Sequence, residues 1–332
     1  MTPRPRVFSG MQPTGGLHIG NYLGALKSWV ALQAEYDCIY CVVDYHAITI
    51  DHQPAELRDR IERVARGYLA AGVDPERSAL FVQSAVPEHT ELAWVFNTLT
   101  PIGLLSRMTQ FKDKSKDHDD NINAGLFTYP ILMAADIAIY KAAAVPVGED
   151  QQQHLEFARD VIRKFNLRYG QLFAEPKTIL SQAPRVLGLD GERKMSKSLG
   201  NDIGLEESAE QVWKKLAPAK TDPARVRKTD PGDPDKCNVY SYHRAFSSEE
   251  TLQWAAAGCR SAGIGCLECK RKLHQHMEEQ LAPLRERLND LASHPERVRE
   301  ILAAGAAKMR PIAQQTIAEV RDRLGIPRLP TP

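Results

Sequence analysis

The sequence predicts an α/β fold in which a doubly wound parallel sheet is followed by a helical C-terminal domain. Short, nearly continuous apolar runs alternate with amphipathic helical patterns in the first half of the chain, as in parallel sheets buried between helices. Residues 249–324 instead carry a predominantly helical pattern, interrupted at 258–265 and at Pro295. The length of 332 residues agrees with about two domains.

Three strands and two helices are expected in the first part of the chain. The strands correspond to the apolar runs at 6–9, 38–43 and 79–82, and the helices to the amphipathic patterns at about 18–33 and 54–71. This order places the carboxyl ends of the strands at one edge of the sheet, where ligands bind in folds of this class. The glycine-rich residues after the first strand lie at that edge.

The remaining elements are predicted from polarity and from turn residues. Residues 110–120 (QFKDKSKDHDD) are too hydrophilic to pack and predict a loop over a site. A buried helix with a single acid, Asp136, is expected at 129–141, a further strand at 144–147 and a helix at 206–216. Proline and aspartate are dense at 221–235, which predicts a turn-rich linker.

Composition excludes several classes of protein. The chain has 43 Lys and Arg against 42 Asp and Glu and is 43% hydrophobic, so it is not collagenous, of low complexity or wholly disordered. Residues 260–328 alone are mildly basic, with 13 Lys and Arg against 9 Asp and Glu. No apolar stretch of the length of a secretory signal follows the N-terminus, and the uncharged run at 93–106 is too short to cross a bilayer, so we expect a cytosolic protein.

Two motifs have residue types that suit a nucleoside triphosphate. Residues 10–21 (GMQPTGGLHIGN) lead from the first strand into a helix, where glycines let backbone N–H groups approach phosphate and His18 can donate to phosphoryl oxygens. Residues 194–198 (KMSKS) hold Lys194 and Lys197 three apart on a loop, so both can reach the β- and γ-phosphates. Taken singly, a tight turn with a packed histidine and a basic surface loop would give the same patterns.

Together, in this order and separation, the two motifs resemble the signatures of class I aminoacyl-tRNA synthetases. The segments SGMQPTGGLHIGNYLGAL, ILMAADIAIY and VGEDQQQH are similar to those of the bacterial tryptophanyl-tRNA synthetases, and the likeness extends across most of residues 6–325. Asn21 stands where the general class signature has a second histidine, a departure that the tryptophanyl branch shares. The resemblance implies activation of L-tryptophan with ATP to tryptophanyl-adenylate and pyrophosphate, then transfer of tryptophan to the 3'-terminal ribose of tRNA(Trp).

The resemblance also implies an ATP site, Mg2+ on the departing pyrophosphate and a homodimer. His18, Lys194, Lys197 and Lys114 would stabilise the transition state. Lys112 and Lys114 would meet pyrophosphate, although both could equally be solvated loop lysines. The nucleotide would be bound by Gln12, Pro13, Thr14, Gly20, Asn21, Gly148, Glu149, Asp150, Val186, Lys194, Met195, Ser196, Lys197 and Ser198.

Asp136 is the candidate residue for selecting tryptophan. Tyr129, Met133, Asp136 and Tyr140 are spaced 4, 3 and 4 residues apart, which places them on one helix face. An indole N–H is only a donor and a carboxylate only an acceptor, so a buried Asp136 would penalise amino acids that leave it unpaired. A salt bridge between helices, or a cap, is the alternative. The expected tryptophan-binding set is Asp136, Met133, Tyr129, Gln151, Phe8 and Val147.

Four of the six cysteines are clustered in the sequence. Cys237, Cys259, Cys266 and Cys269 have the spacing C-x21-C-x6-C-x2-C, which suits zinc or an iron–sulfur centre, with free thiols as the third possibility. A subset of the synthetases that the chain resembles carries a closely similar motif that ligates a 4Fe-4S cluster, so the resemblance favours the cluster over zinc. Cys38 and Cys41 also form C-x2-C, but on a strand they point to opposite faces and are expected in the core.

The expected domains are a Rossmann-like catalytic domain at 1–190, a connector with the KMSKS loop at 191–205, and a helical region at 206–332 that receives the tRNA anticodon and holds the cysteines. Tyrosyl-tRNA synthetase is the nearest rival, because it has the same architecture with a different amino-acid pocket. A non-catalytic RNA-binding or redox-regulatory relative is the rival from another class. A small-molecule adenylyltransferase shares the fold but has no reason for a long basic helical extension.

Overall fold

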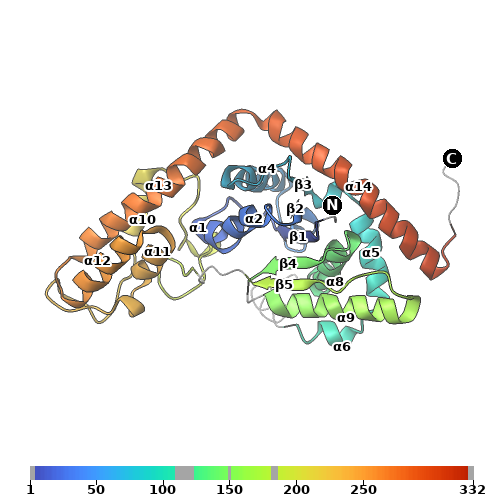
Figure 1. Cartoon of the computed structure of the whole chain (residues 1–332), viewed down its shortest axis with the longest axis horizontal. Coiled ribbons are helices and arrows are strands. Elements are labelled where there is room, and N and C mark those ends of the chain that lie inside the picture. The colour runs from blue at the N-terminus through green and yellow to red at the C-terminus, as the bar shows by residue number, and fades with distance from the viewer. Residues whose placement is uncertain (1–3, 109–122, 149–150, 181–185, 328–332) are drawn as a thin grey trace.

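A parallel five-stranded sheet forms the centre of the molecule. The structure, a computed structural model, describes residues 4–108, 123–148, 151–180 and 186–327. The sheet has the order β3-β2-β1-β4-β5, with every neighbouring pair parallel (Figure 1). Its strands are β1 (Arg6–Met11), β2 (Asp37–Val42), β3 (Ser78–Val82), β4 (Ala144–Val147) and β5 (Lys177–Leu180). The predicted doubly wound α/β fold is confirmed.

The strand order reverses between β1 and β4, which pair at Val7 and Ala144. In open sheets of this type the carboxyl ends of the two strands that flank the reversal border the ligand crevice. The glycine-rich turn after β1 and Gly148 after β4 both lie there. Strand β5 was not predicted, because its four residues are half-buried or exposed at the sheet edge and carry no apolar run.

Helices cover both faces of the sheet. They are α1 (Ile19–Asn21), α2 (Lys27–Leu32), α3 (Asp44–Ala47), α4 (Pro54–Ala71), α5 (Glu88–Asn97), α6 (Ile102–Leu105), α8 (Ala124–Ile139) and α9 (Gln152–Tyr169). The single helix expected at 18–33 is interrupted by a π-helical turn, Tyr22–Leu26, of the kind that is frequent near functional sites. Helix α8 begins before the predicted start because the Asn123 side chain caps it, accepting from Leu126 N at 2.9 Å.

The strands divide the interior into two hydrophobic cores. Ile39 and Cys41 face the core that contains α5, α8 and α9, whereas Cys38, Tyr40 and Val42 face the core that contains α2 and α4. Both cysteines are fully buried free thiols. The prediction that these two cysteines point to opposite faces is therefore confirmed.

The C-terminal region is helical, as predicted. It contains α10 (Ala209–Leu216), α11 (Asn238–Phe246), α12 (Glu249–Arg260), α13 (Cys266–Ser293) and α14 (Pro295–Leu324), with the linker 221–235 free of longer elements. Helices α13 and α14 meet in a bend and form an inverted V over the rest of the molecule (Figure 1). No helix among the residues placed by the structure is long and apolar enough to span a membrane.

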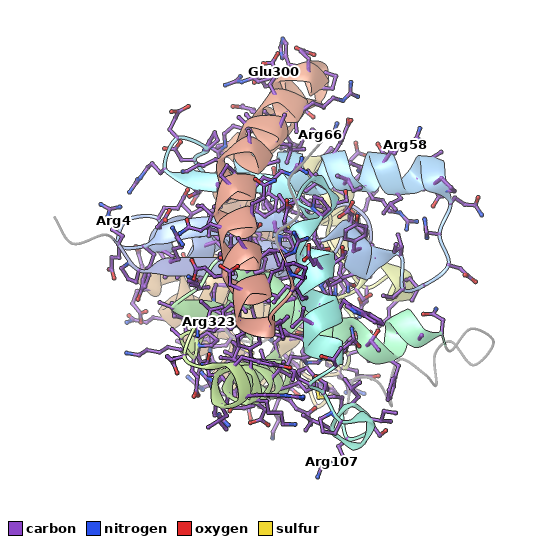
Figure 2. All side chains as sticks on the ribbon, turned by 90° about the vertical axis from the view of Figure 1, so that its right-hand side faces the viewer. Arg4, Arg58, Arg66, Arg107, Glu300 and Arg323 are labelled. Atoms are coloured by element: carbon purple, nitrogen blue, oxygen red, sulfur yellow. The ribbon has the colours of Figure 1, made fainter. Side chains whose placement is uncertain are left out.

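Helix α14 returns to the sheet and covers the edge strand β3. It crosses the molecule between Glu300 and Arg323 beside α5 (Figure 2), and its apolar side chains enter both cores. Gly305 permits this contact, because a Cβ atom there would overlap the backbone of Leu80 in β3. Covering an edge strand removes a row of unpaired backbone groups. The final helix thus completes the α/β unit.

Candidate active site

The turn after β1 brings backbone and His18 to the crevice. Thr14 N donates to Gln12 O at 2.9 Å, and Gly15 has a φ of +147°, a conformation that L-residues rarely adopt. His18 is the N-cap of α1, and its backbone N–H donates to Asn21 Oδ1 at 3.0 Å. The asparagine at this position therefore stabilises the start of the helix that carries the histidine.

His18 is neutral at pH 7. Burial, together with the positive charges of Lys197 and Lys194, lowers its pKa to about 4 against the opposing effect of Asp202. Its Nδ1 is buried and has no hydrogen-bond partner among the residues that the structure places. The ring lies against Gly20, where a Cβ atom would be 2.9 Å from Nδ1. A neutral imidazole next to a crevice can donate one hydrogen bond to a ligand without adding charge.

The segment that follows KMSKS pairs with the first motif through its backbone. Ile19 N donates to Ile203 O and Leu205 N donates to Leu17 O, both at 2.9 Å, so residues 203–205 are fixed beside His18. A Cβ atom on Gly16 would be 2.7 Å from Lys197 Nζ. The structure therefore brings Lys197 to the glycine-rich turn, although the two motifs are almost 180 residues apart in the chain.

Other predicted nucleotide residues surround this loop. Met195 is buried, and its N–H donates to Val186 O at 3.4 Å. Ser196 and Ser198 share a hydrogen bond between their Oγ atoms at 2.9 Å. Asn201 Oδ1 accepts from Ser196 N at 2.8 Å, which fixes the loop. Four expected site residues, Lys112, Lys114, Glu149 and Asp150, lie outside the described residues.

Asp136 on α8 is buried and already accepts three hydrogen bonds. Its donors are His46 Nε2 at 2.8 Å, His89 Nδ1 at 2.6 Å and Gln83 Nε2 at 2.7 Å. Burial alone would raise its pKa, but the bonds from the two histidines outweigh burial and hold the pKa at about 2. Asp136 is therefore ionised, and both histidines donate to it. A carboxylate offers about four acceptor sites, so about one remains.

The other predicted pocket residues lie on α8, on β1 and β4, and at the start of α9. Tyr129 Oη lies 2.8 Å from His154 Nε2, and its ring approaches His46 edge-on at 6.3 Å. Phe8 stacks on Tyr140 at 5.8 Å. Val147 is buried at the end of β4, Met133 is half-buried on α8, and Gln151 caps α9. Apolar side chains near one buried anion suit a flat, largely apolar ligand with a single donor.

Sequence reasoning missed the three donors to Asp136. His46 follows β2, Gln83 follows β3, and His89 begins the next helix, α5. The signal was present, because polar residues directly after neighbouring parallel strands meet at one sheet edge. Their bonds also show that the alternative interpretation of Asp136, a salt bridge between elements, describes its surroundings in part.

The four clustered cysteines lie near one another at the junction of α11, α12 and α13. Burial, together with the other three thiols, raises the pKa of Cys269 to about 12. Each of two thiols has another close contact, Cys269 Sγ with His243 Nε2 at 3.3 Å and Cys259 Sγ with Arg225 Nη1 at 3.8 Å. Within the described ranges, no group of three or more His, Cys, Asp or Glu side chains is arranged to hold a metal ion. The predicted metal centre is therefore not supported.

Comparisons with known proteins agree with this geometry. The family model "tRNA synthetases class I (W and Y)" matches residues 1–282. Tryptophan-tRNA ligase of Deinococcus radiodurans is 50% identical over 329 residues, covering 98% of this chain and 99% of that protein, and the Thermotoga maritima enzyme is 45% identical over 326 residues, covering 97% and 99%.

A solved structure is also similar over nearly the whole chain. The tryptophanyl-tRNA synthetase of Campylobacter jejuni, complexed with ADP and tryptophan, has a TM-score of 0.86 at 35% identity and covers 96% of this chain and 99% of its own. The tyrosyl-tRNA synthetase of Archaeoglobus fulgidus, at 20% identity and a TM-score of 0.68, shares the fold alone. The chain belongs to the class I tRNA synthetases for tryptophan and tyrosine.

Proposed function

We propose that this protein is a tryptophan-tRNA ligase. It activates L-tryptophan with ATP to tryptophanyl-adenylate and pyrophosphate, and then transfers tryptophan to the 3'-terminal ribose of tRNA(Trp), with release of AMP. The observation that carries the proposal is the 50% identity to a tryptophan-tRNA ligase over practically the full length of both chains. The buried carboxylate of Asp136, with about one acceptor site left, supports tryptophan as the amino acid.

Activation needs no enzyme nucleophile, because the carboxylate of tryptophan itself attacks the α-phosphate. The protein aligns the two substrates and stabilises the charge that develops. His18, kept neutral by burial, donates a hydrogen bond to a phosphoryl oxygen. Lys194 and Lys197 neutralise the departing pyrophosphate, with help from Lys114, and Mg2+ accompanies the phosphates as part of the substrate.

The nucleotide lies along the crevice between β1 and β4. We assign its contacts to the remaining residues of the two motifs and of the turn after β4, namely Gln12, Pro13, Thr14, Gly20, Asn21, Gly148, Glu149, Asp150, Val186, Met195, Ser196 and Ser198. The indole lies among Phe8, Met133 and Val147, with its N–H on Asp136. Tyr129 and Gln151 hold the amino-acid end. Phenylalanine leaves the last acceptor site of Asp136 unpaired, which penalises its binding.

Residues 1–190 carry out the chemistry, residues 191–205 connect the two parts, and residues 206–332 receive the tRNA anticodon. The mild excess of Lys and Arg in 260–328 supports phosphate contacts there. We place the enzyme in the cytoplasm and expect it to act as a homodimer. Size-exclusion chromatography with light scattering tests the dimer.

The four cysteines are the candidate ligands of a 4Fe-4S cluster, with zinc as the alternative. Four mutually close thiols are the donor set that both groups use, although their arrangement in the structure is not that of a formed site. A cluster would tie Cys237 to α12 and α13, and no step of aminoacylation passes through it. Anaerobic purification followed by iron and zinc analysis distinguishes the cases, and a protein without either metal would refute both.

Charging of total tRNA with radiolabelled amino acids tests the whole function. Tryptophan should be attached to tRNA and tyrosine should not. Attachment of tyrosine would favour the tyrosyl rival, and attachment of neither, in a protein that still binds tRNA, would favour the non-catalytic RNA-binding relative.

A further inference from the structure

Helix α4 places a second positive side chain beside Lys197 at the glycine-rich turn. A cleft of about 580 Å³ is lined by Thr14, Gly15 and Gly16 of the turn, by Lys197, and by one face of α4 that includes Arg60 and Arg63. The α4 residues belong to neither sequence motif. The cleft therefore joins the predicted phosphate-binding residues to a helix that the sequence did not connect with them.

Arg63 and Lys197 converge on the same backbone position. A Cβ atom on Gly16 would be 2.7 Å from Lys197 Nζ and 3.1 Å from Arg63 Nη2. Lys197 Nζ and Arg63 Nη2 therefore both border the space that the absent side chain of Gly16 leaves open. Burial lowers the pKa of Lys197, and the positive charge of Arg63 lowers it further. Two cations held this close favour an anion between them.

Carboxylates balance Arg63 in the structure. Glu206 accepts from both Nε and Nη2 of Arg63, and Asp59 lies 3.7 Å from Nη1. All three side chains are about one third exposed or more, so these pairs are weak and can exchange with another anion. Glu206 directly follows residues 203–205, which are fixed against His18. Arg63 therefore lines the cleft, and its ion pairs do not prevent it from binding another anion there.

We propose that Arg63 binds the terminal phosphates of ATP, and the pyrophosphate derived from them, together with Lys197, and that Glu206 is its counter-ion when the cleft holds no phosphate. The planar guanidinium suits this role because it can donate two parallel hydrogen bonds to a phosphate. The inference deepens the proposed function and rests on the assignment of Lys197 and the glycine turn to the phosphates.

The experiment measures binding of inorganic pyrophosphate and of ATP by titration calorimetry, in wild type and in R63Q. We expect R63Q to weaken both by about tenfold or more, since hydrogen bonds to charged groups are worth about that much. R63K should recover part of the loss. The KM for tryptophan in ATP–pyrophosphate exchange should stay within about twofold, because α4 does not contribute to the Asp136 pocket.

R60Q is the matched control. Arg60 lies on the same helix, lines the same cleft, and is paired with Glu56 at 2.7 Å with a side chain 33% exposed, against 32% for Arg63. The three atoms nearest to a Cβ atom on Gly16 belong to Lys197 and Arg63, and none of them to Arg60. R60Q should bind pyrophosphate as wild type does, and an equal loss in R60Q and R63Q would overturn the proposal as a general charge effect.

E206Q separates binding of phosphate from a structural role. Loss of the competing carboxylate should leave pyrophosphate binding as tight as in wild type or tighter. If E206Q weakens binding as much as R63Q does, the pair serves only to fix residues 203–206 and the proposal is wrong. Absence of tryptophan-dependent exchange in wild type would instead refute the proposed function, because the calorimetric comparison does not depend on that activity.

Discussion

Replacing His89 by leucine removes two buried hydrogen bonds at once. His89 has no solvent exposure, and its Nδ1 lies 2.6 Å from Asp136 Oδ1 while its Nε2 lies 2.7 Å from Tyr140 Oη. Because Nδ1 donates to an ionised carboxylate, Nε2 accepts from the tyrosine hydroxyl. Loss of a bond to a charged group costs about 1.5–3 kcal/mol, and a buried hydroxyl without an acceptor costs about 1–3 kcal/mol. We expect H89L to lower the free energy of unfolding by about 3 kcal/mol.

Urea unfolding at neutral pH, followed by circular dichroism, measures this loss. The matched control is H52L, because His52 is only partly buried and its ring makes a weak contact, to Ile50 O at 3.3 Å, within the part of the chain that the structure describes. H52L should change the free energy of unfolding by less than about 0.5 kcal/mol. If H89L is as stable as H52L, the buried network does not hold Asp136, and the assignment of Asp136 as a fixed anion is wrong.

Three further predictions address pH, packing and the KMSKS loop. The pKa of His18 falls from 6.5 in the unfolded chain to about 4 in the folded protein, so its contribution to stability is complete above pH 6.5 and is lost as pH falls toward 4. Urea titrations should therefore show that H18Q flattens this part of the curve of stability against pH, and an unchanged curve would argue against a buried neutral His18. G305A should destabilise the fold by about 2 kcal/mol or more, because the new Cβ atom overlaps the backbone of β3. The control G103A has open space around it and should be neutral or stabilising, so equal melting temperatures of the two variants would contradict the contact between Gly305 and Leu80. N201A frees Ser196 N and should raise the KM for ATP in exchange assays several-fold while that for tryptophan is unchanged; a parallel rise in both would indicate general disruption.

The fold could be predicted where the pattern is local. Buried parallel strands give continuous apolar runs, which is why β1 to β4 and the opposite orientations of Cys38 and Cys41 were predicted. The exposed edge strand β5 carries no such run. The return of α14 to β3 depends on a contact between Gly305 and Leu80, and periodicity within one helix does not reveal its partner.

The site residues that lie in motifs were predicted from the sequence, whereas the partners that come from separate elements were missed. His18 and Lys197 lie in two recognisable segments, and the structure brings both to the glycine-rich turn. His46 and His89, in contrast, belong to no motif and meet Asp136 only through the order of strands and helices. The metal prediction rested on thiol spacing and on the resemblance to synthetases with a similar motif, and neither fixes the orientation of a side chain.

ATP–pyrophosphate exchange with tryptophan, tyrosine and phenylalanine in parallel tests the central claim most directly. Exchange should be confined to tryptophan, because the indole N–H can donate to the buried anion of Asp136, phenylalanine has no side-chain donor, and the phenol of tyrosine, which also accepts, needs a different polar arrangement. Exchange that tyrosine or phenylalanine supports as well as tryptophan, or no exchange with any of the three, would contradict the account.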